Sequence, residues 1–171
     1  CHVSEEMLTK NFGSKEELYQ AAFHHALRRQ PLMKVKPERH TNDQWLSELI
    51  EGYLADDHVS GQKSGCPLAF LASHNSSEDA VVRETYASAF LASVRWLSQF
   101  ISPVEGDTKL QAHSLLTTLI GAVNIARSFD NAESRQEYLL HCQSGTTLKL
   151  VKPSKQVSLS SLRAKGTQMM N

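Results

Sequence analysis

Residues 3–19 read VSEEMLTKNFGSKEELY, and this stretch predicts a short helix, a tight turn and a longer second helix. Ser4 is a suitable N-cap for the short helix, and Gly13 suits the left-handed conformation that often ends a helix. Ser14 and Glu17 form an S-x-x-E capping box, and apolar residues follow them at helical spacing. The pattern therefore indicates two helices joined by a glycine turn.

The composition limits the class of protein. Of the 171 residues, 40% are hydrophobic and 21% are charged, which is typical of a folded globular chain. The formal net charge is zero, so only a local basic patch could attract nucleic acid. No apolar run is long enough for a membrane span and no signal-peptide pattern is present, so we expect a cytoplasmic protein without a membrane partner. Cys1, Cys66 and Cys142 match no metal or disulfide spacing, so we expect reduced thiols, no metal and no cofactor.

Apolar residues recur with helical period almost throughout the chain, which predicts an all-α fold. After the first two helices we expect a helix capped by Thr41 or Asn42, then a polar loop over residues 56–64. Further helices are expected over residues 68–73, from the turn at 75–79 to about residue 101, over 109–129, and around Tyr138 before Gly145. The segment after Lys152 is basic and without acids, and we expect it to be disordered.

The helix predicted over residues 109–129 is apolar or small almost all the way round between Leu115 and Ala126. A helix of this kind must be covered on both sides. A second copy of the chain is the simplest cover for one side, and a central core helix of a monomer is the alternative. The residues predicted to lie in the dimer interface are Leu115, Leu116, Leu119, Ala122, Val123 and Ala126.

The string GSKEELY at residues 13–19 and the helices around it resemble the end of the DNA-binding domain in the TetR family of transcriptional repressors. Residues 65–72, GCPLAFLA, look like a G-C-L-L-type segment of one branch of that family. The likeness covers about residues 3–145. It implies a partial helix-turn-helix with its connecting helix over residues 1–30, a helical ligand-binding and dimerisation domain over 41–151, and a basic tail over 152–171.

The same resemblance implies a function, a ligand-responsive repressor rather than an enzyme. As a homodimer, such a protein places two recognition helices on a near-palindromic double-stranded DNA operator. The positions that match the family's DNA-contacting residues are Ser4, Thr9, Lys10, Asn11 and Lys15. Lysine supplies charge for phosphates, and asparagine can read an adenine edge with paired hydrogen bonds.

The family also implies a small, mostly apolar effector held among the middle helices. The candidate lining residues are Trp45, Leu49, Tyr53, Cys66, Phe70, Tyr86, Phe90 and Asn124. Aromatic residues at helical spacing can equally form an ordinary core. Cys66 is either a sensor thiol or a small buried hydrophobic residue.

A second interpretation stays open. The first helix of the expected helix-turn-helix and most of its second are absent from the sequence given, and Glu5 and Glu6 would repel phosphates. The alternative function is therefore a helical dimerisation or ligand-binding module that has lost DNA binding. The residues do not indicate the effector, the operator or the regulated genes.

Overall fold

The computed structural model describes residues 11–30, 32, 36–60, 65–72, 80–102 and 107–151. Within these ranges the chain forms seven α-helices and no strand, which confirms the predicted all-α fold. The helices are α2 (Lys15–Arg28), α3 (Asn42–Tyr53), α4 (Asp56–Val59), α5 (Pro67–Phe70), α6 (Ala80–Leu97), α7 (Thr108–Ala126) and α8 (Ala132–Val151). None of these helices is long and apolar enough to cross a membrane.

The predicted helix starts coincide with capping contacts in the structure. Ser14 accepts a hydrogen bond from the backbone N–H of Glu17 at 3.2 Å, and Gly13 adopts a left-handed φ of 67°. Thr41, rather than Asn42, caps α3 with a complete capping box, in which the side chain of Gln44 also accepts from the Thr41 N–H. The local sequence thus determines where these helices begin.

Two predictions of secondary structure are wrong. The segment expected to be a polar loop contains α4, whose short turn closes with a hydrogen bond from the Ser60 N–H to the Asp56 carbonyl at 2.8 Å. Two acids in its first turn favour a helix N-terminus. The last helix does not end before Gly145 but continues to Val151. A single glycine costs a helix only about 1 kcal/mol, which packing of α8 readily offsets.

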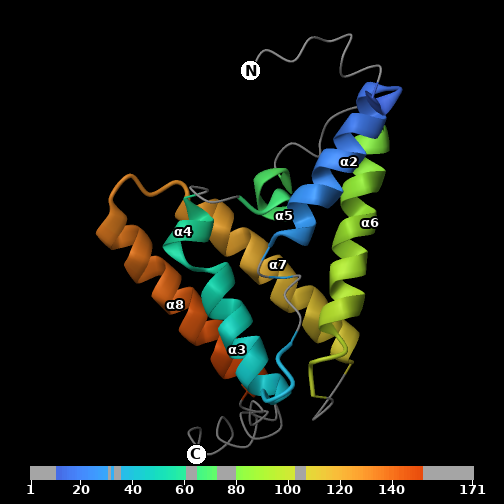
Figure 1. Ribbon diagram of the computed structural model, residues 1–171. Helices are drawn as coiled ribbons and strands as arrows, with labels where there is room; N and C mark the ends of the chain where they lie inside the picture. Colours follow the sequence, from blue (N-terminus) through green and yellow to red (C-terminus); the bar gives the residue numbers. More distant parts are fainter. Residues whose placement is uncertain are drawn as a thin grey trace, which may run out of the picture.

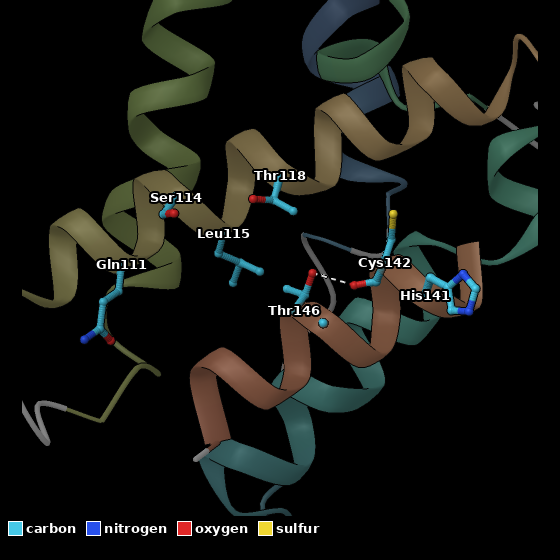
Figure 2. Close-up of a pocket in the computed structure, with 8 residues that line it drawn as sticks. Gln111, Ser114, Leu115, Thr118, His141, Cys142 and Thr146 are labelled. Carbon is cyan, nitrogen blue, oxygen red and sulfur yellow. Dashed lines mark hydrogen bonds between the residues drawn. The ribbon is translucent and has the colours of Figure 1, made fainter. Parts of the chain in front are cut away.

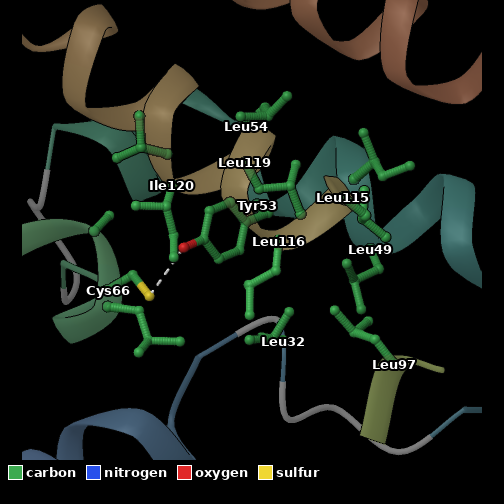
Figure 3. Close-up of a cluster of buried hydrophobic side chains, with 14 of the residues drawn as sticks. Leu32, Leu49, Tyr53, Leu54, Cys66, Leu97, Leu115, Leu116, Leu119 and Ile120 are labelled. Atoms are coloured by element: carbon green, nitrogen blue, oxygen red, sulfur yellow. Dashed lines mark hydrogen bonds between the residues drawn. The ribbon is translucent and has the colours of Figure 1, made fainter. Parts of the chain in front are cut away.

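The centre of the molecule is α7, which contacts α4, α5, α6 and α8. Figure 1 shows α7 running diagonally between two pairs of helices, α2 with α6 and α3 with α8. Its inner face contacts Leu49 and Tyr53 of α3, Leu97 of α6, and Leu32, in one cluster of buried side chains (Figure 3). Burial of this apolar surface is the main stabilising contribution to the fold.

The six residues predicted for the dimer interface all lie in this core. Their side chains are at most 4% exposed in a single chain, from Leu115 and Leu116 at the centre to Ala126 at the end of α7. They are Leu115, Leu116, Leu119, Ala122, Val123 and Ala126. The choice of these residues as an interface is therefore corrected, because the chain's own helices cover most of their surface and only Leu115 also lines a pocket.

Candidate functional site

The first candidate site is the turn before α2. Asn11 and Lys15 are exposed there, and Gly13 and Ser14 hold the backbone turn between them. A side chain at Gly13 would be strained by the positive φ and would place its Cβ 2.7 Å from Glu17 Oε2. The other predicted DNA-contacting residues, Ser4, Thr9 and Lys10, lie outside the described residues.

The residues predicted to line an effector pocket divide into two groups. Four of them are core residues with exposed fractions of 5% or less, namely Trp45, Leu49, Tyr53 and Cys66. The other four keep exposed surface, namely Phe70, Tyr86, Phe90 and Asn124. None of the first group lines the pocket between α7 and α8, and all four side chains lie in the core of the single chain.

Aromatic packing explains the burial of the first group. The Trp45 ring lies 5.1 Å from that of Trp96 and 4.4 Å from that of Phe100, centroid to centroid, so these rings join α3 to the end of α6. Tyr53 donates a hydrogen bond from its hydroxyl to Cys66 Sγ at 3.2 Å. These rings therefore contribute packing to the core.

The buried hydroxyl and thiol groups of this region are kept protonated. Burial raises the pKa of Tyr53 well above its usual value, and burial also raises the pKa of the Cys66 thiol. Burial raises the pKa of Tyr86 to about 12, and its hydroxyl donates to the Leu68 carbonyl at 2.7 Å. Because a thiolate is the reactive form of cysteine, burial and the raised pKa both lower the reactivity of Cys66.

An open pocket of about 300 Å³ lies between α7 and α8. Figure 2 shows side chains of the two helices facing one another across it. The lining residues are Gln111, Ser114, Leu115, Thr118, His141, Cys142, Gly145 and Thr146. The pocket exists because most of these side chains are small, and Gly145 has no atom within 4 Å of the position a Cβ would take.

The lining of this α7–α8 pocket carries no carboxylate, lysine or arginine. Thr146 donates its hydroxyl hydrogen bond to the Cys142 carbonyl at 2.7 Å (Figure 2). Burial, followed by a hydrogen bond with Cys142, raises the pKa of the neighbouring Tyr138 to about 12. The pocket therefore suits a neutral, partly apolar group such as an aliphatic side chain or a small uncharged molecule.

A buried polar junction, which the sequence did not predict, joins α2 to the body of the molecule. Gln30 follows α2 and is 1% exposed, while His58 of α4 is 8% exposed. His58 Nε2 lies 2.8 Å from Gln30 Oε1, and its Nδ1 lies 2.5 Å from the Tyr53 carbonyl. Both residues are usually solvent-exposed types, so their burial follows from tertiary packing and has no local sequence signal.

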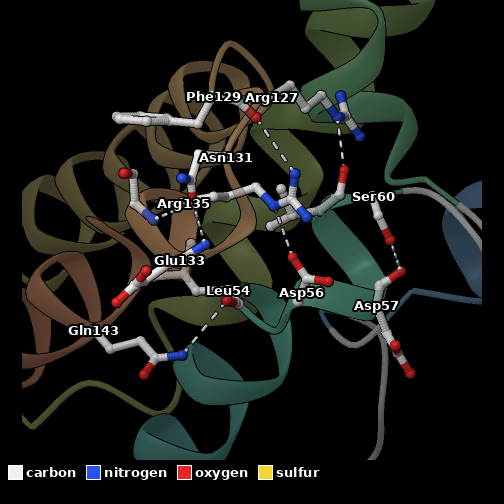
Figure 4. A network of polar contacts seen from close by, with 12 residues as sticks. Leu54, Asp56, Asp57, Ser60, Arg127, Phe129, Asn131, Glu133, Arg135 and Gln143 are labelled. Carbon is white, nitrogen blue, oxygen red and sulfur yellow. Dashed lines mark hydrogen bonds and ion pairs between the residues drawn. The ribbon is translucent and has the colours of Figure 1, made fainter. Parts of the chain in front are cut away.

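Polar contacts also fix α4 against α7 and α8 (Figure 4). Arg127 donates from Nε to the Val59 carbonyl at 3.0 Å. Arg135 of α8 contacts Asp56 of α4 at 2.8 Å, in a partly exposed ion pair. These contacts hold α4, and with it His58, in one position relative to the core.

No cluster of three metal-binding side chains occurs among the described residues. Comparisons of the chain with family models, with curated proteins and with solved structures find no match.

Proposed function

We propose that this chain is part of a ligand-responsive transcriptional repressor of the TetR type, which binds a near-palindromic DNA operator as a homodimer. The observation that carries the proposal is the turn before α2, where Gly13 is left-handed and Ser14 caps α2 as the TetR-like motif requires. The exposed Lys15 follows directly and can meet a DNA phosphate.

The arrangement of α2 supports a connecting role. This helix packs along α6 and against α5 (Figure 1). Its C-terminal end is anchored through Gln30 to His58 of α4. A change among α4, α5 and α6 would therefore move α2 and shift the spacing of two DNA-reading units in a dimer. An effector would act through its different affinity for the two arrangements.

For the homodimer we propose the outer stripe of α7, defined by Leu110, Ser114, Thr117, Gly121 and Ile125. These residues follow one another at helical spacing, and none is charged. Leu110 is 67% exposed and Ile125 is 52% exposed, while Gly121 has open space over its Cα. Large exposed apolar residues beside a glycine, next to the α7–α8 pocket, suit close packing of a second helix.

For a small, mostly apolar effector we propose the side of the molecule where α5, α6 and α7 meet. Phe70, Tyr86, Phe90 and Asn124 come from these three helices and keep exposed surface. The Phe70 ring is 57% exposed and lies 5.1 Å from the Arg127 guanidinium, so an apolar face and a cation are both present there.

The DNA-binding proposal is tested with the protein expressed from its full reading frame, by fluorescence anisotropy on pooled genomic fragments at two salt concentrations. We expect sequence-selective binding that weakens steeply with salt. Lys15→Ala should weaken binding to all sequences and flatten the salt dependence, because one phosphate contact is lost. The matched control is Lys109→Ala, since α7 begins at the opposite end of the molecule from the start of α2 (Figure 1).

Two results of the anisotropy experiment would contradict the DNA-binding proposal. Binding no tighter than about 10⁻⁴ to 10⁻⁶ M without sequence preference is ordinary non-specific association and would reject the repressor. An unchanged salt slope in Lys15→Ala would reject the placement of that residue.

The dimer proposal is tested by analytical ultracentrifugation. Ile125→Glu places a charge in the outer stripe of α7, so we expect it to convert the dimer to a monomer. Leu91→Glu is the control, because Leu91 is 45% exposed on α6 and does not belong to the outer stripe of α7. A wild-type monomer, or equal effects of both variants, would reject this interface.

The second candidate is a ligand-binding dimer without DNA binding. The zero formal net charge favours it, because the chain as a whole carries no excess positive charge to attract DNA. The anisotropy experiment separates the two candidates, whereas the oligomeric state does not.

A further inference from the structure

The contact between His58 and Gln30 has a mismatch of donors and acceptors. The Tyr53 carbonyl can only accept a hydrogen bond, and the Gln30 oxygen that faces His58 Nε2 can also only accept. A neutral imidazole has one N–H and can therefore donate to only one of these two oxygens. The protonated imidazole has two N–H groups and satisfies both.

The neutral ring must therefore change one contact. The Tyr53 carbonyl belongs to α3 and cannot turn, whereas the Gln30 amide can rotate about its last side-chain bond. Rotation presents the amide nitrogen to the lone pair of His58 Nε2. In the structure the Gln30 nitrogen donates to the carbonyls of Ala26 and Gly65 at 3.2 Å and 3.5 Å. After rotation the amide oxygen faces these carbonyls instead, and both hydrogen bonds are lost.

The surroundings set the pH range of this change. Burial lowers the pKa of His58 below its usual 6.5, the Tyr53 carbonyl opposes that shift, and the charge of Arg127 on α7 adds to it. The Tyr53 ring packs on the imidazole at 4.6 Å. Both acids of α4, Asp56 and Asp57, are exposed, and Asp56 is paired with Arg135 of α8. Cys66, which accepts a hydrogen bond from the Tyr53 hydroxyl, stays protonated because burial raises its pKa.

We propose that His58 and Gln30 form a proton-sensitive latch that fastens the end of α2 to α4 and to the segment before α5. Protonated His58 holds the Gln30 amide in the orientation that bonds Ala26 and Gly65. Loss of the proton releases those two bonds and loosens the C-terminal anchor of α2. The latch regulates α2 whether or not the chain binds DNA.

The test is an NMR titration of the protein with ¹⁵N-labelled histidine and glutamine side chains, between pH 4 and 8 and without DNA. We expect His58 to be the Nδ1–H tautomer at pH 7.5 and to become protonated with a midpoint below 6.5. The side-chain amide signal of Gln30 should shift with the same midpoint, because its orientation follows the proton.

Two variants of Gln30 separate a latch from a simple packing contact. Gln30→Leu removes the acceptor, so the proton affinity of His58 should fall at least threefold. Gln30→Glu supplies a carboxylate, so that affinity should rise at least tenfold. Gln20→Leu, on the exposed side of α2, is the control and should leave the midpoint unchanged.

Helix content by circular dichroism verifies that each variant is folded, and Gln30→Glu keeps the test decisive if Gln30→Leu unfolds. The proposal is overturned if His58 stays neutral down to pH 4, if its midpoint lies above 6.5, or if the folded Gln30 variants leave that midpoint unchanged. Because no DNA is present, these results do not depend on the repressor proposal.

Discussion

The surroundings of the two cysteines that lie in the described residues differ sharply. Cys66 is fully buried beside Tyr53 in a closed core, whereas Cys142 is half-buried beside the open α7–α8 pocket. Large aromatic and aliphatic side chains fill the first region, while hydroxyl-bearing residues and a glycine leave the second hollow. Large side chains around Cys66 therefore give a closed core, and small residues on two adjacent helices give a pocket.

The largest expected difference concerns two leucines of α7. Leu116→Ala removes a side chain that is fully buried in the closed core, so we expect a loss of about 2–5 kcal/mol in the free energy of unfolding. Leu110→Ala in the same helix removes a side chain that is 67% exposed in the single chain. In the monomeric Ile125→Glu background it should change that free energy by less than about 0.5 kcal/mol. Urea unfolding followed by circular dichroism measures both. Equal losses of unfolding free energy in the two variants would contradict the assignment of Leu116 to the buried face of α7 and Leu110 to its exposed face.

The sequence predicted the features that depend on neighbouring residues. Gly13 and Ser14 were placed at the turn before α2, and Thr41 at the start of α3, because capping needs only the residues of one turn. Pro67 lies in the first turn of α5, where the missing N–H of proline needs no partner.

The sequence could not predict which face of each helix is covered. Leu115 to Ala126 is apolar almost all round, so its pattern contained no information on the face that a second copy could reach. Trp45 and Tyr53 have the same spacing whether they line a ligand pocket or fill a core. The burial of His58 and Gln30 depends on α4 packing against the end of α2, a contact between residues 28 positions apart.

The second prediction compares the reactivity of the two cysteines. In a Cys1→Ser background, Cys142 should react with an aromatic disulfide reagent at least about 100-fold faster than Cys66, because Cys66 is reached only through local unfolding. The raised pKa of Cys66 further lowers its thiolate fraction at pH 8. Single Cys66→Ser and Cys142→Ser variants assign the two phases in a stopped-flow absorbance measurement. Comparable rates for both thiols would show that the region around Tyr53 is open in solution.

The smallest expected effect is a gain in stability when a glycine that lines the pocket is replaced by alanine. Gly145 lies within α8, and a Cβ added there meets no atom within 4 Å. Gly145→Ala should therefore raise the free energy of unfolding by about 0.5–1 kcal/mol, since alanine loses less backbone entropy in a helix than glycine.

Gly13→Ala is the matched control for this substitution and should have the opposite sign. The left-handed φ of 67° alone costs an alanine about 1–2 kcal/mol, and its Cβ would approach Glu17 Oε2 to 2.7 Å. Thermal unfolding followed by circular dichroism at several protein concentrations measures both variants. A loss of stability in Gly145→Ala that grows with protein concentration would mean that a second copy already occupies this side of the pocket. Only a contact made in the dimer contributes stability that depends on protein concentration.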